Sequence, residues 1–170
     1  MKLLLAVIAL TSCAFAGDAC ALASACGPDS ARFDVKVSER ATPVANNDAA
    51  KARVYVFADG VQTIRIGLDG AWVGAAEARS WVSFLTEPGE HHLCVDWQPS
   101  IARTGSGFSP AEYISLANFT AEAGKVYYFR ARGIILPGHG IVSFGLEATN
   151  SDEGQFLIAS YAPCDFHLRK

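Results

Sequence analysis

The chain has 170 residues, 51% of them hydrophobic, and a formal net charge of −3 at pH 7. A chain of this length can form one domain that buries roughly 70% of the surface its unfolded form exposes. The mildly acidic balance argues against a nucleic-acid partner, because a basic face is the usual signature of such binding.

The first residues predict an export signal. Lys2 precedes an apolar run over residues 3–10. This run is too short to span a bilayer, which needs about 20 apolar residues. Two processing routes compete. Ala14-Phe15-Ala16 is a signal-peptidase site, whereas Leu10-Thr11-Ser12-Cys13 resembles a lipobox in which Cys13 becomes lipidated. The sequence therefore predicts either a periplasmic protein or a membrane-anchored lipoprotein of the bacterial cell envelope, with no transmembrane helix.

Three regions follow from composition. The signal peptide occupies residues 1–16, or ends before Cys13 if the lipobox is used. Residues 17–50 are rich in small and polar residues and predict an N-terminal tether, which contains one short strand over 32–37. The β-sandwich domain is expected over 51–170.

The cysteines fit export, because an even number remains after the leader: Cys20, Cys26, Cys94 and Cys164. Four cysteines allow three pairings, and spacing does not choose among them. We favour Cys26 with Cys94, which would tie the N-terminal segment to a central strand. Cys20 with Cys164 would then join the two ends of the chain. In the alternative, Cys20 lies in a flexible leader and stays free.

The clearest local pattern is a hairpin centred on Asp69-Gly70. An Asp-Gly pair between apolar runs is typical of a type I′ turn, in which both residues need positive φ. The resulting register has two faces. The core face carries the pairs Leu68–Ala71, Ile66–Val73 and Ile64–Ala75, and the opposite face carries Gly67–Trp72 and Arg65–Gly74.

Other strands surround this hairpin in chain order. Residues 51–57 form a strand rich in β-branched and aromatic side chains. Pro88-Gly89 predicts a type II turn that makes a second hairpin from 81–85 and 91–97. Gly124 predicts a third hairpin, between 113–120 and 126–132. A last long strand is expected over 141–148.

The C-terminal region predicts a helix and then irregular chain. Asn150 is a favourable N-cap and acidic residues follow it, so a short helix is expected from about Asp152 to Ser160. The tail from Tyr161 is expected to be irregular. Short strands at regular spacing, joined by Gly- and Pro-containing turns, predict an all-β fold. We expect an antiparallel β-sandwich of about seven to nine strands with this short C-terminal helix.

Candidate chemistry is sparse. His92, Cys94 and Asp96 share one strand face and would suit zinc by ligand type. A disulfide cysteine on an exposed hairpin flank explains the same residues more simply. The chain has no nucleophile elbow and no P-loop lysine. The sequence thus predicts no enzyme, no metal and no cofactor.

The tryptophans are the one feature that points to a ligand. Trp72 falls on the hairpin face away from the predicted core, beside Arg65, and Trp81 follows on the next strand. Exposed aromatic rings could stack on sugars or on a partner surface. In the alternative, another sheet or the N-terminal segment covers this face.

Four segments together resemble a bacterial family, the domain of unknown function 2846 found in predicted envelope lipoproteins. They are VYVF at 54–57, GLDGAWVG at 67–74, EPGEHHLC at 87–94 and AEAGKVYYFR at 121–130. The resemblance covers roughly residues 51–160. It implies a β-sandwich in the cell envelope, with no established activity and no catalytic residues. The hairpins also resemble the PEGA type of surface domain, so we expect an immunoglobulin- or PEGA-like sandwich.

The function predicted from sequence is a non-catalytic binding or structural role in the envelope, with an envelope protein or a glycan as partner. The alternative is a carbohydrate- or peptidoglycan-binding module that uses the surface aromatics. A metal-dependent hydrolase built around His92 and Asp96 ranks third.

Overall fold

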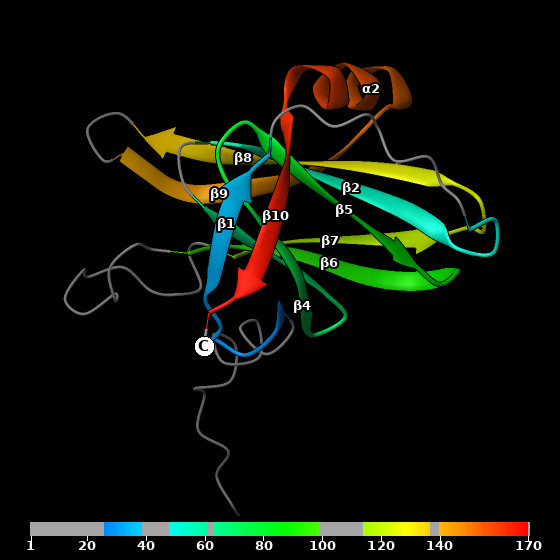
Figure 1. Ribbon diagram of the computed structural model, residues 1–170, viewed down its shortest axis with the longest axis horizontal. Helices are drawn as coiled ribbons and strands as arrows, with labels where there is room; N and C mark the ends of the chain where they lie inside the picture. The colour runs from blue at the N-terminus through cyan, green and yellow to red at the C-terminus, as the bar shows by residue number, and fades with distance from the viewer. Residues whose placement is uncertain (1–25, 39–47, 61–62, 99–113, 137–139, 170) are drawn as a thin grey trace, which may run out of the picture.

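Two β-sheets face each other in the computed structural model, which describes residues 26–38, 48–60, 63–98, 114–136 and 140–169 (Figure 1). Within these ranges no helix is both long enough and apolar enough to cross a membrane. The elements described are β1 (Phe33–Val37), β2 (Ala52–Asp59), β3 (Ile64–Leu68), β4 (Ala71–Ala76), β5 (Ser80–Thr86), β6 (Gly89–Trp97), β7 (Ile114–Ala121), β8 (Val126–Leu136), β9 (Gly140–Thr149), α2 (Ser151–Ser160) and β10 (Ala162–Leu168).

The sheets differ in size and direction. The larger has the strand order β1-β10-β5-β2-β8-β9 and the smaller has the order β4-β3-β6-β7. Every pair in the smaller sheet is antiparallel, whereas β2–β8 and β10–β5 in the larger sheet are parallel. The predicted two-sheet β fold is therefore confirmed. The expectation of a wholly antiparallel sandwich is wrong for the larger sheet.

Strand β2 explains why the 51–57 run is so apolar. It is buried at every residue from Ala52 to Ala58. Val54 and Val56 join the core between the sheets, while Tyr55 and Phe57 pack under α2 on the other face. A strand covered on both faces needs apolar side chains at consecutive positions, not at alternate ones.

Helix α2 lies across the outer face of the larger sheet (Figure 1). The Asn150 side chain accepts a hydrogen bond from the Glu153 amide at 2.9 Å, which confirms the predicted cap. Gly154 faces the Tyr128 ring so closely that a Cβ there would stand 2.4 Å from ring carbons. The absent side chain therefore lets the helix approach the sheet.

Two predicted hairpins are in fact crossings between the sheets. Strand β5 belongs to the larger sheet and β6 to the smaller, and β7 and β8 are separated in the same way. Gly89 and Gly124 do have the expected positive φ, at 142° and 73°. The predictions failed because a hairpin and a crossing share the same strand–turn–strand pattern. In a hairpin the two strands are joined by backbone hydrogen bonds, whereas in a crossing they lie in different sheets and meet through side chains. The sequence around the turn does not say which strand each one pairs with.

The Asp69-Gly70 hairpin is confirmed, but part of its register is wrong. Both turn residues have positive φ, 50° and 83°. The pairs nearest the turn are as predicted. The register then shifts between Ile66 and Gly67, so that the remaining pairs are Ile66–Gly74, Arg65–Ala75 and Ile64–Ala76. Val73 is the extra residue of a β-bulge, and a bulge moves every later pair by one position.

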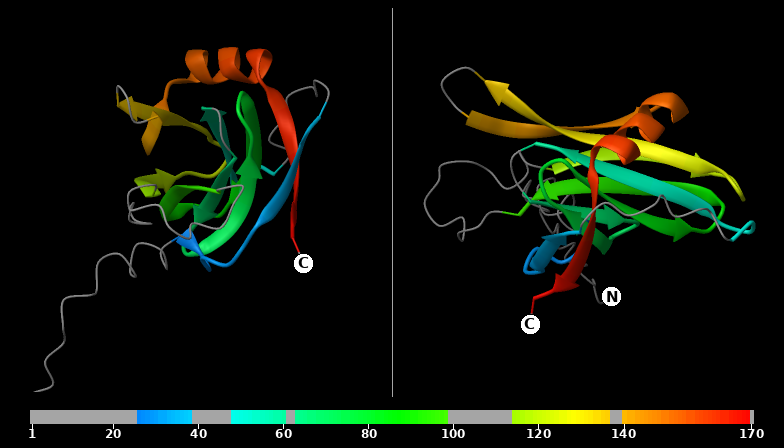
Figure 2. Two further views of the ribbon diagram at one scale, coloured as in Figure 1. Left: turned by 90° about the vertical axis from the view of Figure 1, so that its left-hand side faces the viewer. Right: turned by 45° about the horizontal axis from the view of Figure 1, so that its top comes forward.

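The tail expected to be irregular is strand β10. It pairs with β5 only at Ala162 and Pro163, and then with β1 along its remaining length. Figure 2 shows β1 and β10 running together from the larger sheet toward the smaller one. Cys164 and Phe166 pack against the core between the sheets. Their alternation with Asp165 and His167 was the available signal for a strand.

Gly154→Ala should destabilise the protein, although alanine is the better helix former by about 1 kcal/mol. The new methyl group would meet the Tyr128 ring, which stacks on Tyr55. Overpacking of this kind costs about 1–3 kcal/mol, measurable by denaturant unfolding. Gln155→Ala on the exposed side of the helix should change stability by about 0.5 kcal/mol or less. A gain in stability for Gly154→Ala would contradict this packing.

Candidate functional site

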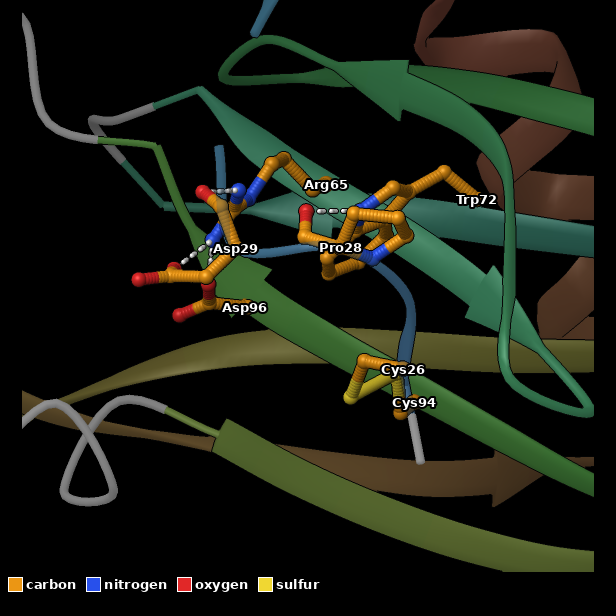
Figure 3. Close-up of a disulfide and its surroundings, with 7 residues drawn as sticks. All are labelled: Cys26, Pro28, Asp29, Arg65, Trp72, Cys94 and Asp96. Carbon is orange, nitrogen blue, oxygen red and sulfur yellow. Dashed lines mark hydrogen bonds and ion pairs between the residues drawn. A yellow bond between two sulfur atoms is a disulfide. The ribbon is translucent and has the colours of Figure 1, made fainter. Parts of the chain in front are cut away.

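Residues 26–31, called the strap, lie against the outer face of the smaller sheet (Figure 3). The Cys26–Cys94 disulfide holds the start of the strap, and both cysteines are fully buried. This pairing confirms the prediction. Gly67 lies opposite Cys94 in the β3–β6 register, and a Cβ there would stand 2.3 Å from the Cys26 carbonyl oxygen. A glycine is therefore required beneath the disulfide.

The Arg65 guanidinium joins the strap to the sheet. Its side chain is 1% exposed and forms an ion pair with Asp96, which is 4% exposed. Its Nη1 donates to the carbonyl oxygens of Asp29 and Ala31 at 2.9 and 2.8 Å. Its Nη2 also lies 3.3 Å from the Asp29 carboxylate. A buried positive charge needs such partners, so the strap completes the site that Asp96 begins.

Trp72 is partly covered by the same strap. Its indole nitrogen donates to the Pro28 carbonyl oxygen at 2.8 Å, and the Arg65 guanidinium stands 4.5 Å from its ring centroid. A Cβ on Gly27 would come within 2.8 Å of the indole. Of the two expectations for this face, the structure agrees with coverage by the N-terminal segment.

The predicted contact residues are only partly brought together. Arg65 and Trp72 are neighbours, but Trp81 lies in the larger sheet beneath α2, where it is 3% exposed. Its indole nitrogen donates to the Tyr161 carbonyl oxygen at 3.2 Å. Trp81 therefore presents no ring face to an external ligand.

The three residues considered for zinc have other partners. Cys94 is in the disulfide, Asp96 pairs with Arg65, and the His92 ring contacts the Asn118 side chain at 2.8 Å. Across the described part of the chain, no three His, Cys, Asp or Glu side chains are grouped to hold a metal ion.

A second polar site, called the clamp, consists of Asp69, Thr86, Glu87 and His91. The His91 Nδ1 lies 2.7 Å from the Asp69 carboxylate, and its Nε2 lies 2.7 Å from the Glu87 carbonyl oxygen and 3.1 Å from the Thr86 hydroxyl. The sequence missed this site. The pairing of β3 with β6 brings Asp69 to this histidine, and the β5–β6 crossing brings Glu87.

The clamp resembles a nucleophile–base–acid arrangement but does not work as one. The Asp69 carboxylate and the Glu87 carbonyl only accept hydrogen bonds, so a ring that bonds both carries protons on both nitrogens. A general base needs an unprotonated nitrogen facing the nucleophile. Thr86 is also only 7% exposed. We therefore interpret the clamp as an ion pair with structural consequences.

The pKa shifts agree with this ion pair. Burial acts to lower the pKa of His91, but hydrogen bonds to Asp69 and to the Glu87 carbonyl, with the charge of Asp69, raise it above its usual value. Burial likewise acts to raise the pKa of Asp69. Hydrogen bonds from the His92 amide and the His91 ring, with the charges of the two histidines, lower that pKa instead.

A third polar cluster attaches α2 to strand β8. Arg130 bridges the carboxylates of Asp59 and Glu153 at 2.5 and 2.7 Å. The Thr149 hydroxyl and then Arg130 lower the pKa of Glu153, and the Tyr161 hydroxyl donates to Asp59 at 3.0 Å. A catalytic general acid needs a raised pKa, so Glu153 is not suited to that role.

Cys164 of strand β10 is one of the residues that line a hollow of about 580 Å³ formed by the paired strands β1 and β10. The Cys164 thiol is free and donates to the Ser80 hydroxyl at 2.8 Å. Burial raises its pKa, which makes it a weak nucleophile. Its predicted partner Cys20 and the lipidation candidate Cys13 lie outside the described residues.

No protein-family model, curated protein or solved structure matches this chain. The resemblance to the domain of unknown function 2846 therefore stays a prediction.

Removal of the strap disulfide should cost much of the stability of the fold. The bond joins residues 68 apart, and closing a loop of that length is worth about 4 kcal/mol in the chain-entropy description. Cys26→Ser combined with Cys94→Ser should lose about that much in denaturant unfolding. Cys164→Ser, which alters one hydrogen bond, should lose about 1 kcal/mol. An equally stable double variant would show that the strap is held by other contacts.

The two carboxylates that pair with Arg65, those of Asp96 and Asp29, should contribute unequally to the stability of the fold. Asp96→Asn leaves a buried charge without its main partner, which costs about 3–5 kcal/mol. Asp29 is 69% exposed, and an exposed ion pair contributes about 1 kcal/mol or less, so Asp29→Asn should have little effect. Equal losses for the two variants, measured by denaturant unfolding, would contradict the central place of Asp96.

Proposed function

We propose that this protein is exported to the bacterial cell envelope and serves there as a non-catalytic binding or structural β-sandwich. The observation that carries the proposal is the buried Cys26–Cys94 disulfide. Disulfides form and persist in oxidising compartments and are rare in the bacterial cytosol. The charged and apolar leader that begins at Lys2 supports the same location independently.

The non-catalytic part of the proposal draws on the polar clusters. In the described ranges, the side chains best suited to chemistry are held in structural contacts: Asp96 by Arg65, His91 by Asp69, and Glu153 by Arg130. A hydrolase centred on His92 and Asp96 loses support, because the cysteine between them is in the disulfide.

A glycan-binding role is a weaker proposal. Such a role needs exposed aromatic ring faces. Trp81 is buried, and the strap and Arg65 partly cover Trp72, which is half-buried. The partner that we favour is therefore an envelope protein.

The finer fold type remains a proposal too. Two facing sheets are compatible with an immunoglobulin- or PEGA-like sandwich. The parallel pairs β2–β8 and β10–β5 depart from a purely antiparallel version.

Mass spectrometry of the protein purified from its own host tests export. We expect a mature N-terminus at Gly17 or a diacylglyceryl group on Cys13, with Cys26 and Cys94 protected from alkylation until a reductant is added. Cys13→Ala should abolish the lipid if the lipobox is used, and should leave a Gly17 terminus unchanged. An unprocessed chain with both thiols free would contradict export.

A further inference from the structure

His91 connects the two sheets at one end of the sandwich. Its ring contacts Asp69 in the turn between β3 and β4, which belong to the smaller sheet. It also contacts Thr86, the last residue of β5 in the larger sheet, and the Glu87 carbonyl just beyond. The Glu87 carboxylate pairs at 2.6 Å with Lys51, the residue before β2. One imidazole ring thus forms the centre of a chain of polar contacts that crosses from sheet to sheet.

We propose that the clamp is a proton-operated latch, in which the imidazolium form of His91 holds the β5–β6 crossing against the β3–β4 turn and the neutral form releases it. A neutral imidazole has a single N–H group. It can donate to the Asp69 carboxylate or to the Glu87 carbonyl, but not to both. Loss of the proton therefore breaks one of the two contacts. The inference does not depend on export.

The charges that face the ring come from two elements. The β3–β4 turn contributes the Asp69 carboxylate, which favours the charged ring. The β5–β6 crossing contributes Glu87, whose carbonyl bonds the ring while its carboxylate pairs with Lys51. The Asp69 carboxylate and the Glu87 carbonyl both favour the protonated ring. The Glu87 carboxylate is paired with Lys51.

The remaining neighbours of the ring lie on β6 and β7. Phe119 of β7 packs against it, with ring centroids 5.5 Å apart, and carries no charge. His92, the next residue on β6, acts on Asp69 through its charge and its amide. The exposed ring of His92 contacts Asn118 at 2.8 Å, so His92→Gln provides a matched control.

The direction of the pH dependence follows from the two shifts. Because folding raises the pKa of His91, the latch contributes fully below the unfolded value of about 6.5 and is lost as pH rises through the folded pKa. Because folding lowers the pKa of Asp69, its contribution is lost as pH falls through that lower folded value. The latch is therefore closed at mildly acidic pH and opens as the medium becomes alkaline.

Amide hydrogen exchange on the purified full chain tests the latch. The informative amides are those of Glu87 and residues 89–92, together with Asp69, whose amide donates to the His92 carbonyl oxygen at 3.0 Å. Protection factors, corrected for intrinsic exchange, should fall between about pH 6 and about pH 9 in the wild type. The fall should be about tenfold for each unit by which folding raises the pKa of His91. His91→Gln should show low protection throughout this range, and His92→Gln should keep the wild-type fall.

An NMR titration of the His91 ring gives a second, independent measurement. Asp69→Asn removes the charge, and asparagine tolerates the positive φ of 50° at this position. The midpoint of the His91 titration should move to lower pH in this variant. An unchanged midpoint, pH-independent protection in the wild type, or the same fall in His91→Gln would each overturn the proposal.

Discussion

A buried positive charge governs the outer face of the smaller sheet. Arg65 is 1% exposed, and burying a guanidinium charge is costly unless it is paired. Asp96 supplies the opposite charge, and the strap supplies two carbonyl oxygens. The disulfide and the Trp72 contact then keep the strap in place. The N-terminal segment is thus part of the fold at this face, because the sheet cannot bury Arg65 without it.

The same principle organises the ends of the sandwich. Apolar side chains from both sheets fill its middle. At its margins, charged groups join segments that are distant in sequence. Arg130 connects strand β2 to helix α2 through Asp59 and Glu153. His91 connects the β3–β4 turn, through Asp69, with the β5–β6 crossing, through Glu87. These contacts can respond to pH where the ionisable group titrates near neutrality, and among these cations only histidine does so.

This distribution bears on function. In the described part of the chain, Asp96, His91 and Glu153 hold the fold together through ion pairs. A buried disulfide suits an oxidising compartment. Both observations support our proposal of an envelope protein that binds or supports another molecule.

The sequence by itself determined the local features: the Asp69-Gly70 turn, the Asn150 cap, the positive φ of Gly89 and Gly124, and most of the strands. These depend on backbone preferences and side-chain periodicity within a few residues. The even number of cysteines indicated disulfide bonding, but it left three pairings open, of which the structure has Cys26–Cys94. Only the tertiary structure decided which sheet each strand joins, the bulge at Val73, the strand in the tail and the meeting of His91 with Glu87. Alternation specifies that a strand has a buried face, but the strand that pairs with it is chosen by contacts between distant residues.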